Sequence, residues 1–524
     1  MTMHDRARAM NPEECTPFES VASILASRTG WRACVRAALL AVAVLGLGCS
    51  ASDSGGMSGT GISQGSINSF GSIFVNGVEW NVAGATIELD GVRRNESDLR
   101  VGMVVRVDGT YSTDGLSGDA DRVTFDDSIE GPIEAAPIET VAGLEKTFSV
   151  LGTSVIARSD QTAFDDGATY AGLAANDVVE VSGFVDATGA IHATRIQRKG
   201  VFPTVDDVEL RGRVANLVKN QDGSGIFDLG TIIVRYESST TFKDLTRASL
   251  ATGDLVEVKA TILDSDEVDA ERIELETVGF GSGDLDDAKV EGIVVLCVES
   301  PDYCIDGVPI DDNGATFDPI GYTPMPGDLC EAEGSLVAGV LVATRIRAED
   351  DDHSARNVRI DAAATSVNGT ARTLVILGVT ISADGNTRLE DKSDLDDDNL
   401  AFSELQAGQY LRIEAVSTGT NTARALKIER DDADAGDDDV RLEGPVTALD
   451  PNAPSLSILG QSVPLDGGTQ YRDENDQSRS EEEFFRNPGD VALDDIVRAR
   501  DEDAANLSAL TESDEVELET VVQN

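Results

Sequence analysis

A short pattern that recurs six times along the chain constrains the fold more than any other feature. Its clearest copy is Leu250–Val258, in which a leucine and two spacers precede Gly253 and Asp254, and alternating apolar and charged residues follow. This order is typical of a tight turn that leads into a half-buried β-strand. Looser copies begin at residues 99, 173, 327, 405 and 491. Six copies predict a tandem array of β modules.

Turn signals within the copies predict the order of the strands. The repeat that holds the first copy also contains Asn76-Gly77, the strongest short-range hairpin signal. Later repeats carry pairs such as Leu151-Gly152 at a comparable place. The spacing predicts three strands, a short connection and two further strands in each module of roughly 70 to 80 residues. Closing five short strands into a barrel removes exposed edges. We therefore predict an all-β chain of about six five-stranded, OB-like barrels; a β-sandwich built from paired repeats is the alternative.

The same motifs set the predicted boundaries. The predicted modules comprise residues 61–129, 130–200, 208–276, 289–350, 356–430 and 440–522, with acidic linkers at 277–288 and 431–439.

The N-terminal region carries the signals of an exported, lipid-anchored protein. Basic residues precede an apolar run at 37–48, which is too short to span a membrane. The end of this run resembles a bacterial lipobox, although its leucine, Leu45, lies four residues before the cysteine. We predict a signal peptide within residues 1–48, lipidation (palmitate) of Cys49 and a flexible Ser/Gly-rich tether at 49–60. An ordinary cleaved signal followed by an incidental cysteine is the alternative.

The net charge limits the partners that the chain can bind. The sequence has 41 basic and 96 acidic residues, a formal charge of −55, and 40% hydrophobic residues, which suffice for packed cores. Such a surface repels nucleic acid phosphates. We expect no nucleic acid partner, membrane contact through the lipid anchor alone, and an unknown envelope protein or polysaccharide as partner. By analogy, Ser50 after Cys49 favours the outer membrane.

The first module carries a family resemblance. Residues Phe70–Val78 and Leu99–Gly109 resemble the hallmarks of a bacterial family of domains of unknown function, numbered fifty-six sixty-six. Weaker forms of the same pattern extend over most of the chain from Gly61 onward. The resemblance implies an envelope or secreted protein, commonly a lipoprotein, with repeated β modules. It implies no established activity and no catalytic residues.

The titratable residues predict no catalytic site. The three histidines, His4, His192 and His353, lie in different segments, and no nucleophile elbow, zinc motif or phosphate-binding loop occurs. We expect no catalytic residue and no cofactor. Cys297 and Cys304 flank a predicted hairpin turn and are predicted to form a disulfide, as suits an exported protein. Cys330 is expected to be a small buried apolar residue.

The acidic linker at residues 431–439 is a weak candidate for a metal site. Asp432, Asp434 and Asp437 could offer oxygen ligands to calcium, but the spacing lacks the distal Glu of a calcium loop. A solvated spacer is the preferred interpretation, and calcium is then expected to add little to stability beyond magnesium. The sequence thus predicts a non-enzymatic multidomain binding or scaffold lipoprotein, with a carboxylate-based hydrolase and a calcium-binding surface protein as alternatives.

Overall fold

The computed structural model describes most of the chain after the tether. It describes residues 60–520 except 114, 203–206, 265, 277–279, 281–283, 298–302, 350–356, 396, 434–437, 451, 487–489 and 503. The predicted signal peptide, Cys49 and the tether up to residue 59 therefore lie outside the described residues, as do His4 and His353. Among the described residues no helix is long and apolar enough to cross a membrane.

Module 1 shows how the repeat folds. Its elements are β1 (Thr60–Ser69), β2 (Ile73–Val75), β3 (Val78–Asn81), β4 (Thr86–Leu89), β5 (Val92–Arg94), the 3₁₀ turn η1 (Glu96–Asp98), β6 (Val104–Tyr111) and β7 (Ser117–Phe125). Strand β1 pairs with β2, β2 with β3, β3 runs parallel to β7, and β6 connects β7 back to β1. The five strands form a closed barrel, which confirms the predicted fold class.

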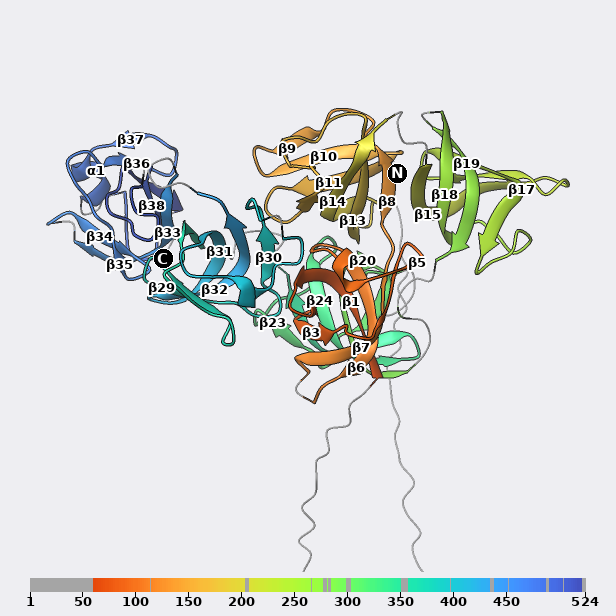
Figure 1. Cartoon of the computed structure of the whole chain (residues 1–524), viewed down its shortest axis with the longest axis horizontal. Helices are drawn as coiled ribbons and strands as arrows, with labels where there is room; N and C mark the ends of the chain where they lie inside the picture. The colour runs from red at the N-terminus through yellow and green to blue at the C-terminus, as the bar shows by residue number, and fades with distance from the viewer. Residues whose placement is uncertain are drawn as a thin grey trace, which may run out of the picture. The chain divides into compact units, whose positions relative to one another are not determined.

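Modules 2 to 4 repeat this order (Figure 1). Module 2 comprises β8 (Ile129–Pro132), β9 (Ile138–Val141), β10 (Glu145–Val150), β11 (Thr153–Arg158), β12 (Ala163–Asp165), β13 (Asp177–Val185) and β14 (Ile191–Val201). Module 3 comprises β15 (Asp207–Lys219), β16 (Gly225–Leu229), β17 (Ile232–Lys243), β18 (Leu255–Asp264) and β19 (Glu267–Leu275). Module 4 comprises β20 (Leu285–Leu296), β21 (Tyr303–Ile305), β22 (Val308–Asp311), β23 (Thr316–Asp318), β24 (Leu329–Val337) and β25 (Val340–Ala348).

Modules 5 and 6 keep the order with additions. Module 5 comprises β26 (Val358–Ala363), β27 (Ser366–Asn368), β28 (Thr373–Ile376), β29 (Val379–Ser382), β30 (Arg388–Asp391), η2 (Phe402–Glu404), β31 (Tyr410–Gly419) and β32 (Thr422–Asp431). Module 6 comprises β33 (Val440–Asp450), β34 (Ser455–Ile458), β35 (Gln461–Ser462), β36 (Gln470–Arg472), β37 (Ser478–Arg479), helix α1 (Glu481–Phe485), β38 (Ile496–Asp501) and β39 (Glu515–Thr520). Helix α1 lies between β37 and β38 of module 6.

Alternation along the strands builds the barrel cores. Strand β6 alternates between partly exposed and buried positions, so Val105, Val107 and Tyr111 point inward. They pack with the fully buried Trp80 of β3. Burying a large apolar side chain stabilises the fold by about 1.5–3 kcal/mol, so each small barrel depends on a dozen or so such residues. This inward and outward alternation is the pattern from which the strands were predicted.

The first strands of the modules pair with one another. Strand β1 lies parallel to β20, whereas β8 lies antiparallel to β15 and β26 antiparallel to β33. Module 1 is thereby joined to module 4, module 2 to module 3, and module 5 to module 6, in sheets of 13, 12 and 14 strands. The modules are therefore barrels that associate in pairs through their first strands.

Several predicted boundaries shift in the structure. Strand β20 begins at Leu285, so the last four residues of the predicted linker 277–288 belong to module 4. Strand β1 begins at Thr60, the last residue of the predicted tether. Other limits shift by one residue, at Ile129, Val201, Asp207 and Asp431. Within β20, Asp287 and Ala288 pair with β1, a contact between modules that local sequence does not encode.

Candidate cation site at the junction of modules 1 to 3

Three glutamates lie next to one another where β8 of module 2 pairs with β15 of module 3. Strand β8 lies between β13 and β15, and its Glu130 is directly opposite Glu180 on one side and Glu209 on the other. Like charges directly opposite each other on neighbouring strands are destabilising. Glu180 and Glu209 are buried, with 4% and 7% of their surface exposed, so solvent screens little of this repulsion. The row therefore needs a compensating positive charge or proton.

Two aspartates of module 1 extend this group of acids. Asp127 lies in the short segment between β7 and β8, and Asp90 lies at the turn between β4 and β5. The backbone N–H of Asp90 donates to the carbonyl of Phe125, and the N–H of Asp127 donates to Oδ1 of Asp90 at 3.2 Å. Because β4 runs beside β7, these bonds hold both aspartates at the point where the chain enters module 2.

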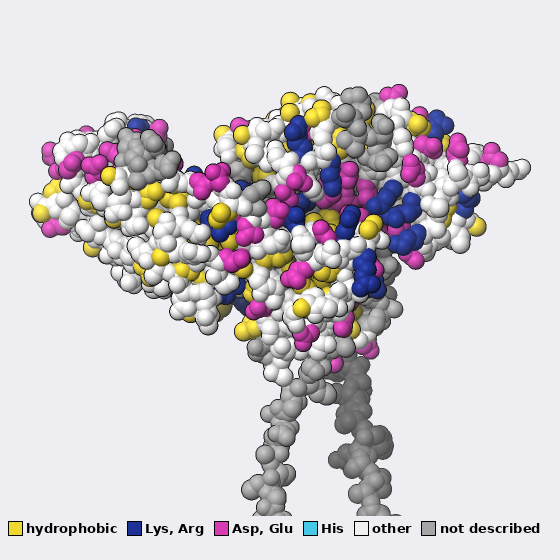
Figure 2. Space-filling view, viewed as in Figure 1, with side chains coloured by type: hydrophobic (Ala, Val, Ile, Leu, Met, Phe, Trp, Pro, Cys, Tyr) yellow, Lys and Arg dark blue, Asp and Glu magenta, His cyan; other side chains and the backbone are white. Residues whose placement is uncertain are grey.

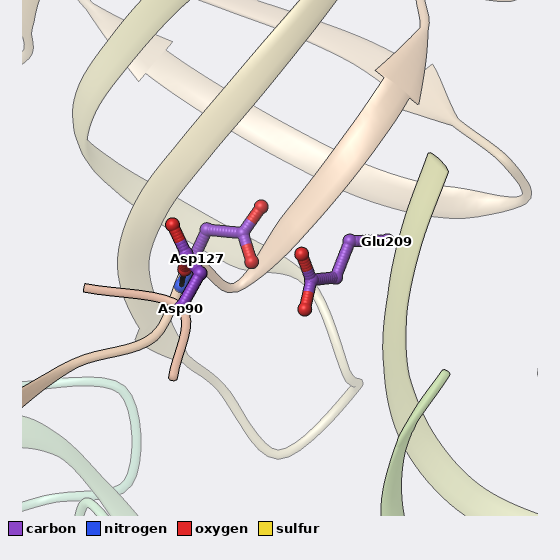
Figure 3. Close-up of side chains that lie close together, drawn as sticks. All are labelled: Asp90, Asp127 and Glu209. Atoms are coloured by element: carbon purple, nitrogen blue, oxygen red, sulfur yellow. Dashed lines mark hydrogen bonds between the residues drawn. The ribbon is translucent and has the colours of Figure 1, made fainter. Parts of the chain in front are cut away.

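Asp127 is the least satisfied polar group of the junction. Only 2% of its surface is exposed, and neither carboxylate oxygen has a hydrogen-bond partner. Oε1 of Glu209 is also buried without a partner. Figure 3 shows the carboxylates of Asp127 and Glu209 facing each other, with Asp90 beside Asp127. Buried carboxylates are almost always paired, hydrogen-bonded or coordinated to a metal, so this arrangement indicates a missing positive group.

The carboxylate oxygens are close enough to share one ion. One oxygen each from Asp90, Asp127 and Glu209 lie within 4.8 Å of one another, and the same holds for Asp127, Glu130 and Glu180. Asp127 belongs to both groups. We call the five residues the junction acids: Asp90, Asp127, Glu130, Glu180 and Glu209.

Basic side chains compensate the junction acids only in part. Lys199 and Arg195 form ion pairs with Glu180, and Nζ of Lys259 lies 2.9 Å from Oε2 of Glu209. Arg195 is shared with Asp165, which it contacts more closely, so the five carboxylates, when ionised, keep an excess of negative charge. In Figure 2, Asp and Glu side chains gather on the face in view near β8 and β13, with Lys and Arg side chains beside them. A bound cation would offset this excess.

Without an ion, Asp90, Asp127, Glu130 and Glu209 hold protons more tightly than usual. Burial, with the nearby acids adding to it, raises the pKa of Asp127 well above its ordinary value. Burial also raises the pKa of Asp90 to about 6 and that of Glu130 to about 7. For Glu209, burial and a hydrogen bond shared with Glu257 raise the pKa to about 9. The geometry therefore favours either a bound proton or a bound cation.

The junction of modules 5 and 6 provides an internal comparison. There Glu443 of β33 occupies the place of Glu130, since both open the repeat before a glycine, and its partner on β26 is Arg359. Across six neighbouring strands, each residue of the following row is directly opposite the next: Glu517, Arg498, Glu443, Arg359, Glu414 and Lys427. The corresponding row at the junction of modules 2 and 3 is Gln197, Glu180, Glu130, Glu209, Lys259 and Arg272. Charge alternates in the first row, whereas the second places three acids side by side.

A second group of carboxylates lies at a cavity. Glu291, Arg347 and Glu349 help to line a cavity of about 230 Å³. Burial raises the pKa of Glu291 to about 7 and that of Glu349 to about 8. The backbone N–H of Ser66 donates to Oε2 of Glu291 at 2.8 Å, so this carboxylate, unlike Asp127, has partners within the protein.

The residues singled out from the sequence lie elsewhere. Cys297 and Cys304 form a disulfide with their Cα atoms 5.5 Å apart, and Cys330 is fully buried beside the hydroxyl of Tyr322. His192 lines the cavity at Glu291, and its Nε2 lies 3.2 Å from Oδ2 of Asp186, within hydrogen-bond distance. The structure brings none of these four residues to the junction acids.

The acidic linker is described only in part. Asp434 and Asp437 lie outside the described residues. The exposed Asp432 accepts a hydrogen bond from the backbone N–H of Asp394. The calcium candidates of the linker therefore stay a prediction.

Sequence reasoning missed the junction acids. Glu130 and Gly131 open the second repeat, and nothing local to this pair indicates a buried charge. Glu209 lies two residues before Arg211-Gly212, the matching pair of the third repeat, and Asp90 precedes a glycine, as turn residues commonly do. A usable signal was the register of these first strands: aligning Glu209 with Arg359 shows an acid where another copy has a base.

Comparisons with known proteins give a broad family match and remote structural matches. A family model described as "Domain of unknown function (DUF5666)" matches residues 62–124, 130–197, 211–274, 362–429 and 443–523. Module 4 lies outside these ranges, although its strands pair in the same order. No curated protein matches the chain. A solved structure described as "drosophila Unr CSD456" matches at 14% identity over 42% of this chain and 95% of that one; its TM-score of 0.11 supports no inference.

Proposed function

We propose that this chain, which belongs to the DUF5666 family of domains of unknown function, is a non-enzymatic scaffold of the bacterial cell envelope. In this proposal it is exported, carries a lipid on Cys49 and holds a protein or polysaccharide partner at the outer membrane. Its barrels supply a framework of fixed spacing, and the partner recognises the surface of that framework.

The pairing of first strands is the observation that supports a scaffold. Modules joined only by linkers would move independently, with distances set by chain entropy. Here β1 and β20 share a ladder that includes Ile62 opposite Ala288 and Gln64 opposite Val290, and the other modules are joined in the same manner. Backbone pairing of this kind holds two barrels at one spacing.

Fixed spacing can be measured with spin labels. Cysteines introduced at the exposed positions Asp121 of β7 and Val337 of β24 would carry the labels, in a mature chain that begins at Ser50. We expect a single narrow distribution of distances between modules 1 and 4. A broad distribution, like that of two barrels on a flexible linker, would contradict the scaffold.

The lipid anchor has its own test. In cells fed radioactive palmitate, the native chain should be labelled and membrane-bound, and the Cys49→Ala variant should be neither. Capture of crosslinked partners from the same two strains then shows whether partner binding depends on the anchor. Equal labelling of both forms, or labelling of neither, would count against a lipoprotein.

A carboxylate-dependent hydrolase is a second candidate, favoured by the cavity at Glu291 and Glu349. A pKa near 7 or 8 would let such a group act as a general acid at neutral pH. The test is hydrolysis of envelope polysaccharides by the purified chain, with Glu349→Gln as the matched variant. Turnover that disappears in this variant would replace the scaffold proposal, whereas absence of turnover in both would favour it.

A further inference from the structure

We propose that one calcium ion binds among the junction acids, between Asp127, Glu209 and Asp90, and joins modules 1, 2 and 3. This goes beyond the scaffold role, because it assigns a specific ligand to a specific site. It also differs from the expectation drawn from the acidic linker, that calcium adds little beyond magnesium.

The position of the free oxygens indicates a ligand. A cluster of acids on a surface is commonly solvated, but Asp127 is 2% exposed and both its oxygens lack partners. Lys259 contacts Oε2 of Glu209, whereas Oε1 has no hydrogen-bond donor, and the group that shares a hydrogen bond with this carboxylate is another acid, Glu257. The unsatisfied atoms thus point at one another, and at the place where a cation would neutralise them.

The donor set selects the kind of metal. All the candidate ligands are carboxylate oxygens, which suit magnesium, calcium and manganese; no thiol or imidazole is among the five that would favour zinc or copper. Calcium takes six to eight oxygens at about 2.3–2.6 Å, so opposite ligands lie about 4.6–5.2 Å apart. The three oxygens lie within 4.8 Å of one another, so they can contact a single ion of this size. Magnesium usually keeps several waters and binds one or two carboxylates.

The junction of modules 5 and 6 shows which side chain the ion would replace. Modules 5 and 6 join with Arg359 between Glu443 and Glu414, so protein side chains alone balance that row. Modules 2 and 3 join at the same register with Glu209 in the position of the arginine. A calcium ion at the junction supplies the positive charge that the arginine supplies elsewhere.

The ion would join three modules at once. Asp90 belongs to module 1, Asp127 lies two residues before β8, the first strand of module 2, and Glu209 belongs to module 3. Calcium binding should therefore protect the segment between β7 and β8 from proteolysis, as well as raise the melting temperature.

Calorimetric titration of the metal-free mature chain with calcium chloride tests the proposal. In high sodium chloride, where screening by added salt is already saturated, we expect one calcium ion per chain with a dissociation constant of roughly 10⁻⁵ to 10⁻³ M. Millimolar calcium should raise the melting temperature clearly more than the same concentration of magnesium. Equal increases with both ions, or no heat of binding, would overturn the proposal.

Three variants make the test specific to the site. Asp127→Asn keeps the shape of the side chain and should weaken binding at least about tenfold. Asp432→Asn removes the same charge from the exposed linker and should leave the titration unchanged. If Asp127→Asn binds calcium as tightly as the native chain, the proposal is wrong.

The third variant exchanges two charges without altering the net charge. Glu209→Arg combined with Lys259→Glu gives these two positions the charges that Arg359 and Glu414 have at the junction of modules 5 and 6, while Glu180 stays opposite Glu130. We expect this double variant to lose the calcium-dependent rise in melting temperature and to melt, without calcium, at least as high as the native chain. A full calcium response in the double variant would overturn the proposal, even where Asp127→Asn fails to fold.

Discussion

At the scale of single residues, the chain compensates the repulsion between like-charged side chains on paired strands in more than one way. Glu291 of β20 is opposite Glu331 of β24, as Glu130 is opposite Glu209. Glu291, however, accepts hydrogen bonds from the backbone N–H and the hydroxyl of Ser66, and Glu331 pairs with Arg347. The protein itself therefore supplies donors at Glu291, whereas Asp127 has none.

The raised pKa of Glu291 makes stability depend on pH. Burial raises it from 4.5 to about 7, so the folded chain keeps this proton where the unfolded chain has released it. The contribution to the free energy of unfolding is unchanged below about pH 4, falls as pH rises from 4.5 through 7, and stays lowered above that. In Glu291→Gln this loss should be absent. We expect the variant to be more stable than the native chain at pH 8, on the order of 2 kcal/mol, and about equal at pH 4.5.

Chemical denaturation of both proteins across this pH range measures the difference. Glu96→Gln, on the exposed turn η1, removes an equal charge and is the control; its stability should parallel that of the native chain. A Glu291→Gln variant whose stability runs parallel to the native chain from pH 4.5 to 8 would show that the group is ionised throughout.

The residue scale also shows where sequence reasoning stops. Asn76-Gly77 predicted its hairpin because both residues favour the left-handed backbone, and both adopt it, with φ of 52° and 71°. Glu130 gave no comparable signal, because its environment is made by Glu180 and Glu209, 50 and 79 residues away in the sequence. Local preference determines a turn; partners on other strands determine a buried charge.

At the scale of elements, the second hairpin keeps one two-residue turn with different sequences in modules 1, 2, 4, 5 and 6, whereas the turn of module 3 has a positive φ at Gly230 alone. Leu151-Gly152 and Leu459-Gly460 have both residues at positive φ, as Asn76-Gly77 does. Leucine seldom adopts this conformation, and the side chains of Leu151 and Leu459 are 3% and 0% exposed. Burial of the leucine in the barrel end therefore offsets the backbone strain.

Two glycines of these turns should differ in their tolerance of a methyl group. Gly152 and Gly230 both have positive φ, so Gly→Ala at either site should cost about 1 kcal/mol from strain. A Cβ at Gly152 would also lie 1.8 Å from Oγ1 of Thr231, whereas nothing lies within 4 Å of one at Gly230. We expect Gly152→Ala to be the more destabilising by at least about 1 kcal/mol.

Adding Thr231→Ala provides the control for this comparison. With the hydroxyl gone, Gly152→Ala should cost no more than Gly230→Ala in urea denaturation. Equal costs for the two single variants would mean that the turns of modules 2 and 3 do not touch as described.

At the scale of the whole molecule, the net charge of −55 opposes compaction. Mutual repulsion of the acids weakens as salt shortens its range, so the melting temperature should rise from roughly 0.05 to 0.5 M sodium chloride. Potassium chloride should act equally, because this effect is not specific to the ion. A melting temperature that is flat or falls over this range would show that the ion pairs along the strands dominate over the net repulsion.

The pairing of modules is the part of the fold that the sequence did not predict. The repeat indicated barrels because each copy has its own turns and alternating strands. The partner of a first strand is set by edges exposed after each barrel closes, and β1 and β8 carry similar alternating patterns. Nothing in Gly61–Gln64 alone distinguishes β20, in module 4, from the first strand of the adjacent module 2.

The pairing of β1 with β20 has a consequence for biogenesis. Gly61 and Asp287 are opposite each other but 226 positions apart (287 minus 61). At about 5–20 residues per second, a ribosome needs roughly 11 to 45 s to make that span. During this interval modules 1 to 3 can close while the outer edge of β1 stays open to any other extended chain. A nascent chain of this protein would therefore need a chaperone at β1 until module 4 is made.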